Sequence, residues 1–171
     1  MRGRAATVLI LAATLTMAFA PGCRTSTRSG LPGHIKSVEV HVFKNKTMTL
    51  DLEGKLTRAV IDAVNADPAV RVASRGDAVL TGEITRYSRR TLRDTTTDEL
   101  GTVQLVVEAS FSLYDAREGV YLVDEAKLSS LDLELSLGVY EYNLGEPEAV
   151  AQNRLLRELG REIVRRSIGR W

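Results

Sequence analysis

The chain has 171 residues, of which 44% are hydrophobic, and its formal net charge is +1. This length predicts one domain with an apolar core, and the balanced charge argues against a nucleic-acid-binding protein. The single cysteine, Cys23, rules out an internal disulfide.

The first expected element is a secretory signal peptide over residues 1–22. Two arginines precede an apolar run of 16 residues, 5–20, which is shorter than the roughly 20 residues of a transmembrane helix. The next residues, 20–23, resemble a bacterial lipobox, in which the cysteine is acylated and becomes the new N-terminus. We therefore expect a lipid anchor at Cys23; the alternative is plain secretion with an incidental thiol.

Residues 23–33 are expected to form the lipidated cysteine and a flexible tether, because they are rich in Ser, Thr, Gly and Pro. Removing residues 1–22 leaves 149 of the 171 residues, with 21 basic and 22 acidic side chains. In lipoproteins of this kind, an aspartate after the cysteine retains the protein at the inner membrane. Arg24 stands there instead, so the resemblance implies transfer to the outer membrane.

A single domain is expected over residues 34–171, and it begins with a strand. Residues 36–43 alternate in polarity, which predicts a strand with one buried side. The side chains expected on the buried side are Val38, Val40 and Val42. The side chains expected on the opposite side are Glu39, His41 and Phe43.

A helix is expected after this strand. In the connecting turn, Asn45 and Thr47 are typical turn residues, and the side-chain oxygen of Asp51 is expected to cap the helix. Pro68 marks its end, and a short strand is expected over residues 70–73. The apolar stripe of the helix comprises Leu52, Leu56, Ala59, Val60 and Ala63.

Three strands joined by hairpins are expected next, over residues 78–93, 102–114 and 120–129. The middle one has an apolar residue at every second position from Val103 to Leu113, which is typical of a strand with one buried face. In the strand before it, Tyr87 is expected on the face opposite Leu80 and Ile84.

The alternation of leucines over residues 131–137 leaves two interpretations open, continued strand pairing or a loop with a buried edge. A second helix is expected over residues 150–168, with Pro147 in its first turn. Its inner stripe comprises Leu155, Leu156, Leu159 and Ile163. Together the elements predict an α+β two-layer sandwich, with two helices packed on one face of a mainly antiparallel sheet of about four strands.

Three stretches, residues 35–47, 52–60 and 77–84, resemble the lipopolysaccharide-assembly lipoprotein (LptE) family, and so does the order of signal, lipobox, tether, strand, helix, strands and helix. The resemblance implies a non-enzymatic protein on the periplasmic side of the outer membrane. It also implies an LptD-like β-barrel partner, in which the protein sits as a plug, and binding of lipopolysaccharide during its transport to the outer leaflet.

Four arginines are the candidate ligand-binding residues for lipid phosphates: Arg86, Arg89, Arg90 and Arg93. Guanidinium groups bind phosphate through two parallel hydrogen bonds. Alternation places the first and third on one face of the strand and the other two on the opposite face. The alternative interpretation is a charged edge strand that resists aggregation.

Two further sets could contact a partner. Arg157, Arg161 and Arg165 follow one another at steps of four residues, which is typical either of a solvated helix face or of a partner surface. Tyr140 and Tyr142 are expected in a loop that could meet a barrel wall.

No catalytic, metal or cofactor site is predicted. His34 and His41 are about 23 Å apart in an extended chain, so they cannot share a metal ion, and an acylated Cys23 offers no thiolate ligand. Two other functions stay open. One is a regulatory lipoprotein that activates a cell-wall synthase across the periplasm, which a tether of about ten residues disfavours; the other is a periplasmic hydrolase.

Overall fold

The computed structural model describes residues 30–92, 102–133, 138–141 and 147–169. The predicted signal peptide and Cys23 lie outside these residues, as do Arg93 and Tyr142.

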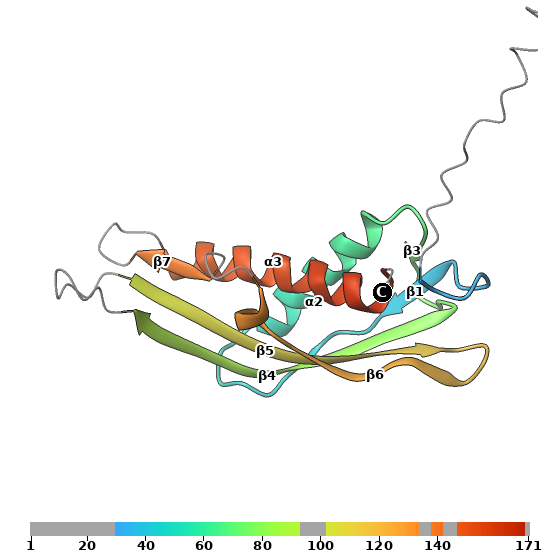
Figure 1. Cartoon of the computed structure of the whole chain (residues 1–171), viewed down its shortest axis with the longest axis horizontal. Helices are drawn as coiled ribbons and strands as arrows, with labels where there is room; N and C mark the ends of the chain where they lie inside the picture. Colours follow the sequence, from blue (N-terminus) through green and yellow to red (C-terminus); the bar gives the residue numbers. More distant parts are fainter. Residues whose placement is uncertain (1–29, 93–101, 134–137, 142–146, 170–171) are drawn as a thin grey trace, which may run out of the picture.

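Two helices, α2 (Leu52–Asn65) and α3 (Glu148–Ser167), form one layer over a curled sheet (Figure 1). The sheet has seven strands, five of them in the order β3-β1-β4-β5-β6. Their bounds are β1 Ser37–Val40, β2 Lys44–Asn45, β3 Arg71–Val72, β4 Ala78–Leu92, β5 Thr102–Asp115, β6 Val120–Ser129 and β7 Val139–Glu141.

The predicted α+β class and the two helices are confirmed, but the sheet is mixed and larger than expected. β1 runs parallel to both β3 and β4, β2 runs parallel to β4, and β4, β5 and β6 are antiparallel. The parallel pairs arise because α2 carries the chain back across the sheet between β1 and β3, which is how parallel strands are joined. The segment between β3 and β4 passes close to β1. A Cβ at Gly76 in this segment would lie 2.3 Å from the Glu39 nitrogen, so only glycine fits there.

The segment predicted as one strand over residues 36–43 is two strands with a change of register between them. Val40 of β1 lies opposite Leu80, whereas Lys44 of β2 lies opposite Glu83. Four residues of one strand therefore span three residues of the other, and an extra residue of this kind reverses the alternation of side chains.

The reversal decides which side chains face the helices. Val38 is buried as predicted, but Phe43 is only 1% exposed and Val42 is 68% exposed. The amide of Phe43 donates to the Thr57 hydroxyl of α2 at 3.0 Å. The predicted sides of Val42 and Phe43 are wrong because alternation holds only while the register is constant.

Helix α2 begins after Asp51 as predicted, but the Asp51 side chain makes no capping hydrogen bond. Asp51 has a φ of 64°, and its carbonyl accepts from the Lys55 amide at 3.3 Å. Asn45 instead fixes the turn, because its side-chain nitrogen donates to the Thr49 carbonyl and to the Glu53 carboxylate, both at 2.8 Å. The sequence therefore predicted the start of the helix but not the contacts that hold it.

A bulge in β4 moves Tyr87 to the helix-covered face. Leu80 and Ile84 are buried as predicted, but the register with β5 shifts between Ile84 and Arg86. Tyr87 consequently lies opposite Val107, whose side chain belongs to the core. The predicted face of Tyr87 is wrong because a single extra residue inverts the faces of the residues that follow.

The leucine alternation after β6 does not continue the strand. The chain enters a 3-10 turn, η2 (Ser130–Asp132), whose Ser130 hydroxyl accepts from the Val107 amide of β5 at 2.9 Å. Leu133 packs against the core, so the alternative of a loop with a buried edge is the correct one up to this residue. The rest of the segment, residues 134–137, lies outside the described residues.

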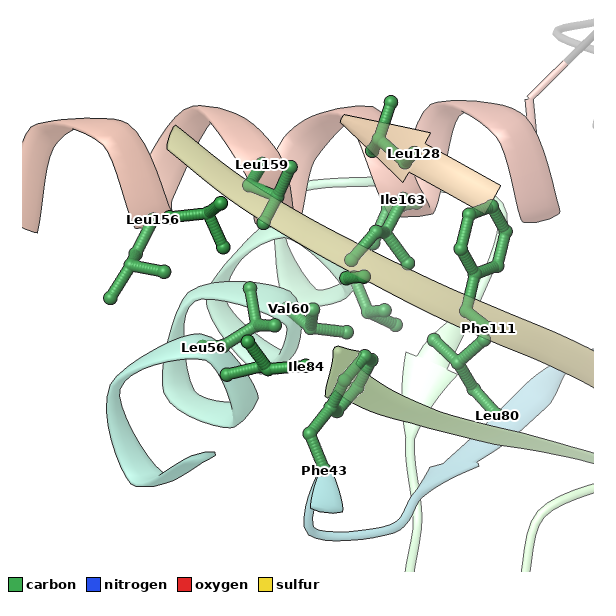
Figure 2. Packing of buried hydrophobic residues seen from close by; sticks show 14 of the residues in the cluster. Phe43, Leu56, Val60, Leu80, Ile84, Phe111, Leu128, Leu156, Leu159 and Ile163 are labelled. Atoms are coloured by element: carbon green, nitrogen blue, oxygen red, sulfur yellow. The ribbon is translucent and has the colours of Figure 1, made fainter. Parts of the chain in front are cut away.

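The core lies between the helices and one face of the sheet (Figure 2). The predicted inner stripe of α3 is confirmed, since Leu155, Leu156, Leu159 and Ile163 are all buried. The two helices touch where a Cβ at Gly160 would lie 3.0 Å from the Ala59 Cβ. No helix among the described residues combines the length and the apolar character needed to cross a membrane.

Candidate functional site

The sheet has one face that neither helix covers, which we call the open face (Figure 1). It carries the side chains of β5 that alternate with the core residues, and the side chains of β4 and β6 that lie opposite them. From β5 these are Gln104, Val106, Glu108, Ser110 and Ser112. Because alternate residues of a strand point to opposite faces, this surface follows directly from the register.

Two adjoining cavities, of about 380 and 370 Å³, form a groove on the open face. Glu83, Ser110 and Glu125 line both cavities, so the two are continuous. Ser110 is small and buried at the centre of the sheet, and a small side chain there leaves room for the groove.

Charged side chains surround this groove. Lys44 and Lys46 line one cavity, and Lys127 lines the other. Lys46 donates to Glu83 at 2.7 Å. Glu125 adopts a φ of 44°, and its amide donates to the Ser112 hydroxyl at 2.9 Å. The groove therefore offers lysines, carboxylates and hydroxyls together.

Two of the four arginines predicted to bind lipid phosphates face the open side. Arg86 lies opposite Glu108 and donates to its carboxylate at 3.3 Å. Arg90 lies opposite Gln104, farther along the same face, and is exposed. Arg93 lies outside the described residues.

Arg89 lies on the other face, in a polar network at the end of α3. It donates to Glu148 at 3.0 Å, and the hydroxyls of Tyr87 and Tyr140 donate to the same carboxylate at 2.8 and 3.3 Å. Burial, and next the hydrogen bond to Glu148, raise the pKa of Tyr87 to about 12. The split of Arg86 and Arg90 from Arg89 agrees with the predicted alternation, so the arginines form no single cluster.

Tyr140 is not the exposed loop residue that the sequence predicted. It lies in β7, which pairs with the start of β5, and it is 5% exposed. The prediction is wrong because β7 is only three residues long, too short for a periodic pattern to mark it as a strand.

The second set of arginines lines a different cavity, of about 500 Å³, between α2 and α3. These residues are Arg157, Arg161 and Arg165. Arg161 pairs with Glu158, and Arg165 donates to Glu162 at 2.5 and 2.6 Å. Asp62 and Asp67 line the same cavity. The two acidic side chains offset part of the arginine charge. The open-face groove has four carboxylates, Glu83, Glu108, Glu125 and Asp132, beside its three lysines, so charge alone does not rank one cavity above the other.

The two histidines contact different acidic residues. His34 lies 2.7 Å from Asp115, and His41 lies 3.0 Å from Glu39. Within the part of the chain that the structure describes, no group of three or more His, Cys, Asp or Glu side chains could hold a metal ion.

The open-face groove can bind a ligand that carries both hydroxyl groups and charges. Its lysines attract phosphate, its carboxylates accept hydrogen bonds from ligand hydroxyls, and its own hydroxyls accept or donate. The sequence missed its lysines, Lys44, Lys46 and Lys127. The alternating positions of Lys44 and Lys46 were visible, but only the register of β2 and β6 brings Lys127 to the same face.

A family model described as LptE, lipopolysaccharide-assembly, matches residues 35–167. No curated protein matches the sequence.

Solved structures with a similar fold include the hypothetical protein CT253 from Chlamydia trachomatis, which is 10% identical with a TM-score of 0.54 over 77% of this chain and 95% of that one. Protein XCC0632 from Xanthomonas campestris is 13% identical with a TM-score of 0.51, over 79% and 85% of the two chains. An uncharacterized lipoprotein B from Nitrosomonas europaea is 14% identical with a TM-score of 0.47, over 79% and 82%.

Proposed function

The chain belongs to the LptE family of lipopolysaccharide-assembly proteins, and from that premise we propose that it is a non-enzymatic plug and assembly factor of an outer-membrane β-barrel. In this function it binds lipopolysaccharide while the lipid passes to the outer leaflet. The observation that carries the proposal is the family match, which spans both helices and all seven strands.

The open-face groove is the proposed lipopolysaccharide site. Lipopolysaccharide presents sugar hydroxyls and phosphates. The groove presents Lys44 and Lys127 to the phosphates, and Ser110 and carboxylates to the hydroxyls. Arg86 and Arg90 extend the same face toward the end of β4. Arg89 is assigned a structural contact to Glu148, because it lies on the opposite side of the strand.

The proposed anchor is an acyl group on Cys23, which is joined to the domain by a short tether on the periplasmic side of the outer membrane. The amide of Gly30 donates to the Ile168 carbonyl at 3.2 Å. The N-terminal end of the domain therefore lies beside the C-terminal end of α3. The seven residues from Cys23 to Gly30 span at most about 25 Å. A domain on such a tether stays at the membrane surface, where a barrel partner would be found.

Purification of the tagged chain from detergent-solubilised outer membrane tests the barrel partnership. We expect one large β-barrel protein at a stoichiometric ratio. Recovery without such a protein would contradict the plug function, and recovery of a peptidoglycan synthase would favour the regulatory lipoprotein instead. Palmitate labelling of the Cys23→Ser variant checks the anchor, since the label should be lost.

Binding of lipopolysaccharide to purified domains tests the groove. The Lys44→Glu, Lys127→Glu double variant should lose most of its affinity, because two cations beside the ligand become anions. The matched control is Arg157→Glu, Arg161→Glu, which makes the same change of charge in the cavity between the helices. Equal loss in both variants would mean that net charge, rather than the open face, determines binding.

A further inference from the structure

The connection between β2 and α2, residues 46–51, presents two apolar side chains entirely to solvent. Met48 is 99% exposed and Leu50 is 87% exposed, and these are the largest exposed fractions among the large hydrophobic residues of the described chain. Nearby Val42 is also exposed. Exposed apolar side chains that gather at one place are typical of an interaction site.

Hydrogen bonds hold this loop in one shape. The Asn45 carboxamide oxygen accepts from the Thr47 amide at 2.9 Å, and the Thr47 hydroxyl accepts from the Thr49 amide at 3.2 Å. The Lys46 amide donates to the Ile84 carbonyl at 2.9 Å. Polar backbone groups that are bonded internally can leave water at little cost, and a loop that is already ordered loses little entropy on binding.

The loop lies at the end of α2 away from the predicted membrane anchor. Residues 66–68, which follow α2, line the same cavity as Gly169, and Gly30 donates to the neighbouring Ile168 carbonyl. The chain therefore enters the domain beside the C-terminal end of α2, and the loop precedes its N-terminal end (Figure 1). A helix of 14 residues is about 21 Å long, so the loop lies roughly that far from the point where the chain enters the domain.

Two of the three lysines near the loop are paired, and Lys44 is the third. Lys46 contacts Glu83 at 2.7 Å, and Lys55 lies 3.8 Å from Asp51. Membrane-inserting segments usually combine apolar side chains with unpaired cations that attract anionic lipids. Within the described chain, one unpaired lysine beside the loop is fewer cations than such a segment usually presents, so the charges favour an apolar pocket in a protein over a bilayer.

We infer that Met48 and Leu50 dock into an apolar pocket on the wall of the β-barrel partner. The inference rests on the proposed function, because it takes that barrel as the occupant. Lys46 begins the loop, Lys44 precedes it, and both line the open-face groove. Docking at this point would therefore place the groove beside the barrel wall, on the path of the transported lipid.

Photo-crosslinking in cells tests the inference. A photoreactive amino acid placed at Met48 or Leu50 should give an adduct with the barrel, and one placed at Val120 or Val150 should not. Val120 and Val150 are matched controls because they are large exposed hydrophobic residues on other elements. Adducts with phospholipid alone would assign the loop to the bilayer and overturn the inference.

The Met48→Asp, Leu50→Asp variant gives a second measurement. It should lower the amount of co-purified barrel at least tenfold while the thermal unfolding midpoint stays unchanged, because both side chains are exposed; the Val120→Asp, Val150→Asp control should retain the barrel. If the wild-type chain recovers the barrel and the loop variant recovers it equally, the inference fails and the proposed function stands. If the wild-type chain recovers no barrel, the proposed function fails first, and the inference fails with it.

Discussion

Strand β5 has two faces, and the comparison between them shows where stability and binding reside. Toward the helices it presents large apolar side chains, including Leu105, Phe111 and Leu113. Toward the open face it presents Gln104 and Ser110, which are also buried because β5 lies between β4 and β7 at Gln104 and between β4 and β6 at Ser110. Burial alone therefore does not mark the core. The helix-covered face stabilises the fold, whereas the open face keeps small polar residues where a groove is needed.

The largest expected effect lies on the helix-covered face. Phe111 is fully buried in the core cluster with Leu80 (Figure 2), so Phe111→Ala should lower the free energy of unfolding by about 3–5 kcal/mol. The matched open-face change is Thr81→Ala, at an exposed position of β4, with an expected effect within about 0.5 kcal/mol. Chemical denaturation of both variants measures the difference, and similar losses would mean that the two faces contribute alike.

The second prediction concerns the contact between the helices. Gly160→Ala places a Cβ 2.8 Å from the Ala59 carbonyl carbon, so we expect overpacking to lower the free energy of unfolding by about 1–3 kcal/mol. Gly54→Ala is the control in α2, where the nearest atom is a carboxylate oxygen of the flexible Asp51 side chain at 3.0 Å. Alanine is favoured over glycine in helices, so the control should gain about 0.5–1 kcal/mol. A stabilising Gly160→Ala would show that the helices can move apart freely.

Most of the helix-covered face could be predicted from the sequence, because its pattern is long. The unbroken alternation through β5 and the stripe of α3 each extend over many residues, and both are confirmed. The change of face between Val40 and Phe43 and the bulge before Arg86 could not be predicted. Each depends on one extra residue in a pair of strands, and pairing is a tertiary contact that a local pattern does not contain.

The candidate site was harder to predict than the core. The sequence identified arginines in β4 and their alternation, and the structure separates Arg86 and Arg90 from Arg89 accordingly. It did not identify Lys44 or Lys127, since these residues are far apart in the chain and meet only through the sheet. Isolated lysines resemble ordinary surface charges until the topology is known.

A smaller effect on stability is expected from Asp77, whose carboxylate accepts hydrogen bonds at the start of β1. Hydrogen bonds from the Lys36 amide, and next from the Ser37 hydroxyl, lower the pKa of Asp77 below its ordinary value. The Asp77 carboxylate therefore contributes stability above the unfolded-state pKa of about 3.9, and this stability is lost as the pH falls through the lower, folded-state pKa.

Asp77→Asn removes this dependence, so the unfolding midpoint of the variant should fall less between pH 5 and pH 2 than that of the wild-type chain. Asp62→Asn, at an exposed position of α2, serves as the control and should follow the wild-type curve. An identical acid response in all three proteins would contradict the role of Asp77.

The smallest effect on stability is expected on the open face, and it gives the sharpest test of the comparison. Lys44 and Lys127 lie on β2 and β6 and line the groove without belonging to the core cluster. Replacing both by alanine should change the free energy of unfolding by less than about 0.5 kcal/mol, while the affinity for lipopolysaccharide should fall, because two cations that attract phosphate are removed. Denaturation and binding measured on the same preparation would separate the two outcomes. A variant that unfolds easily would place the lysines among the stabilising residues, and a stable variant with unchanged affinity would move the ligand away from this face.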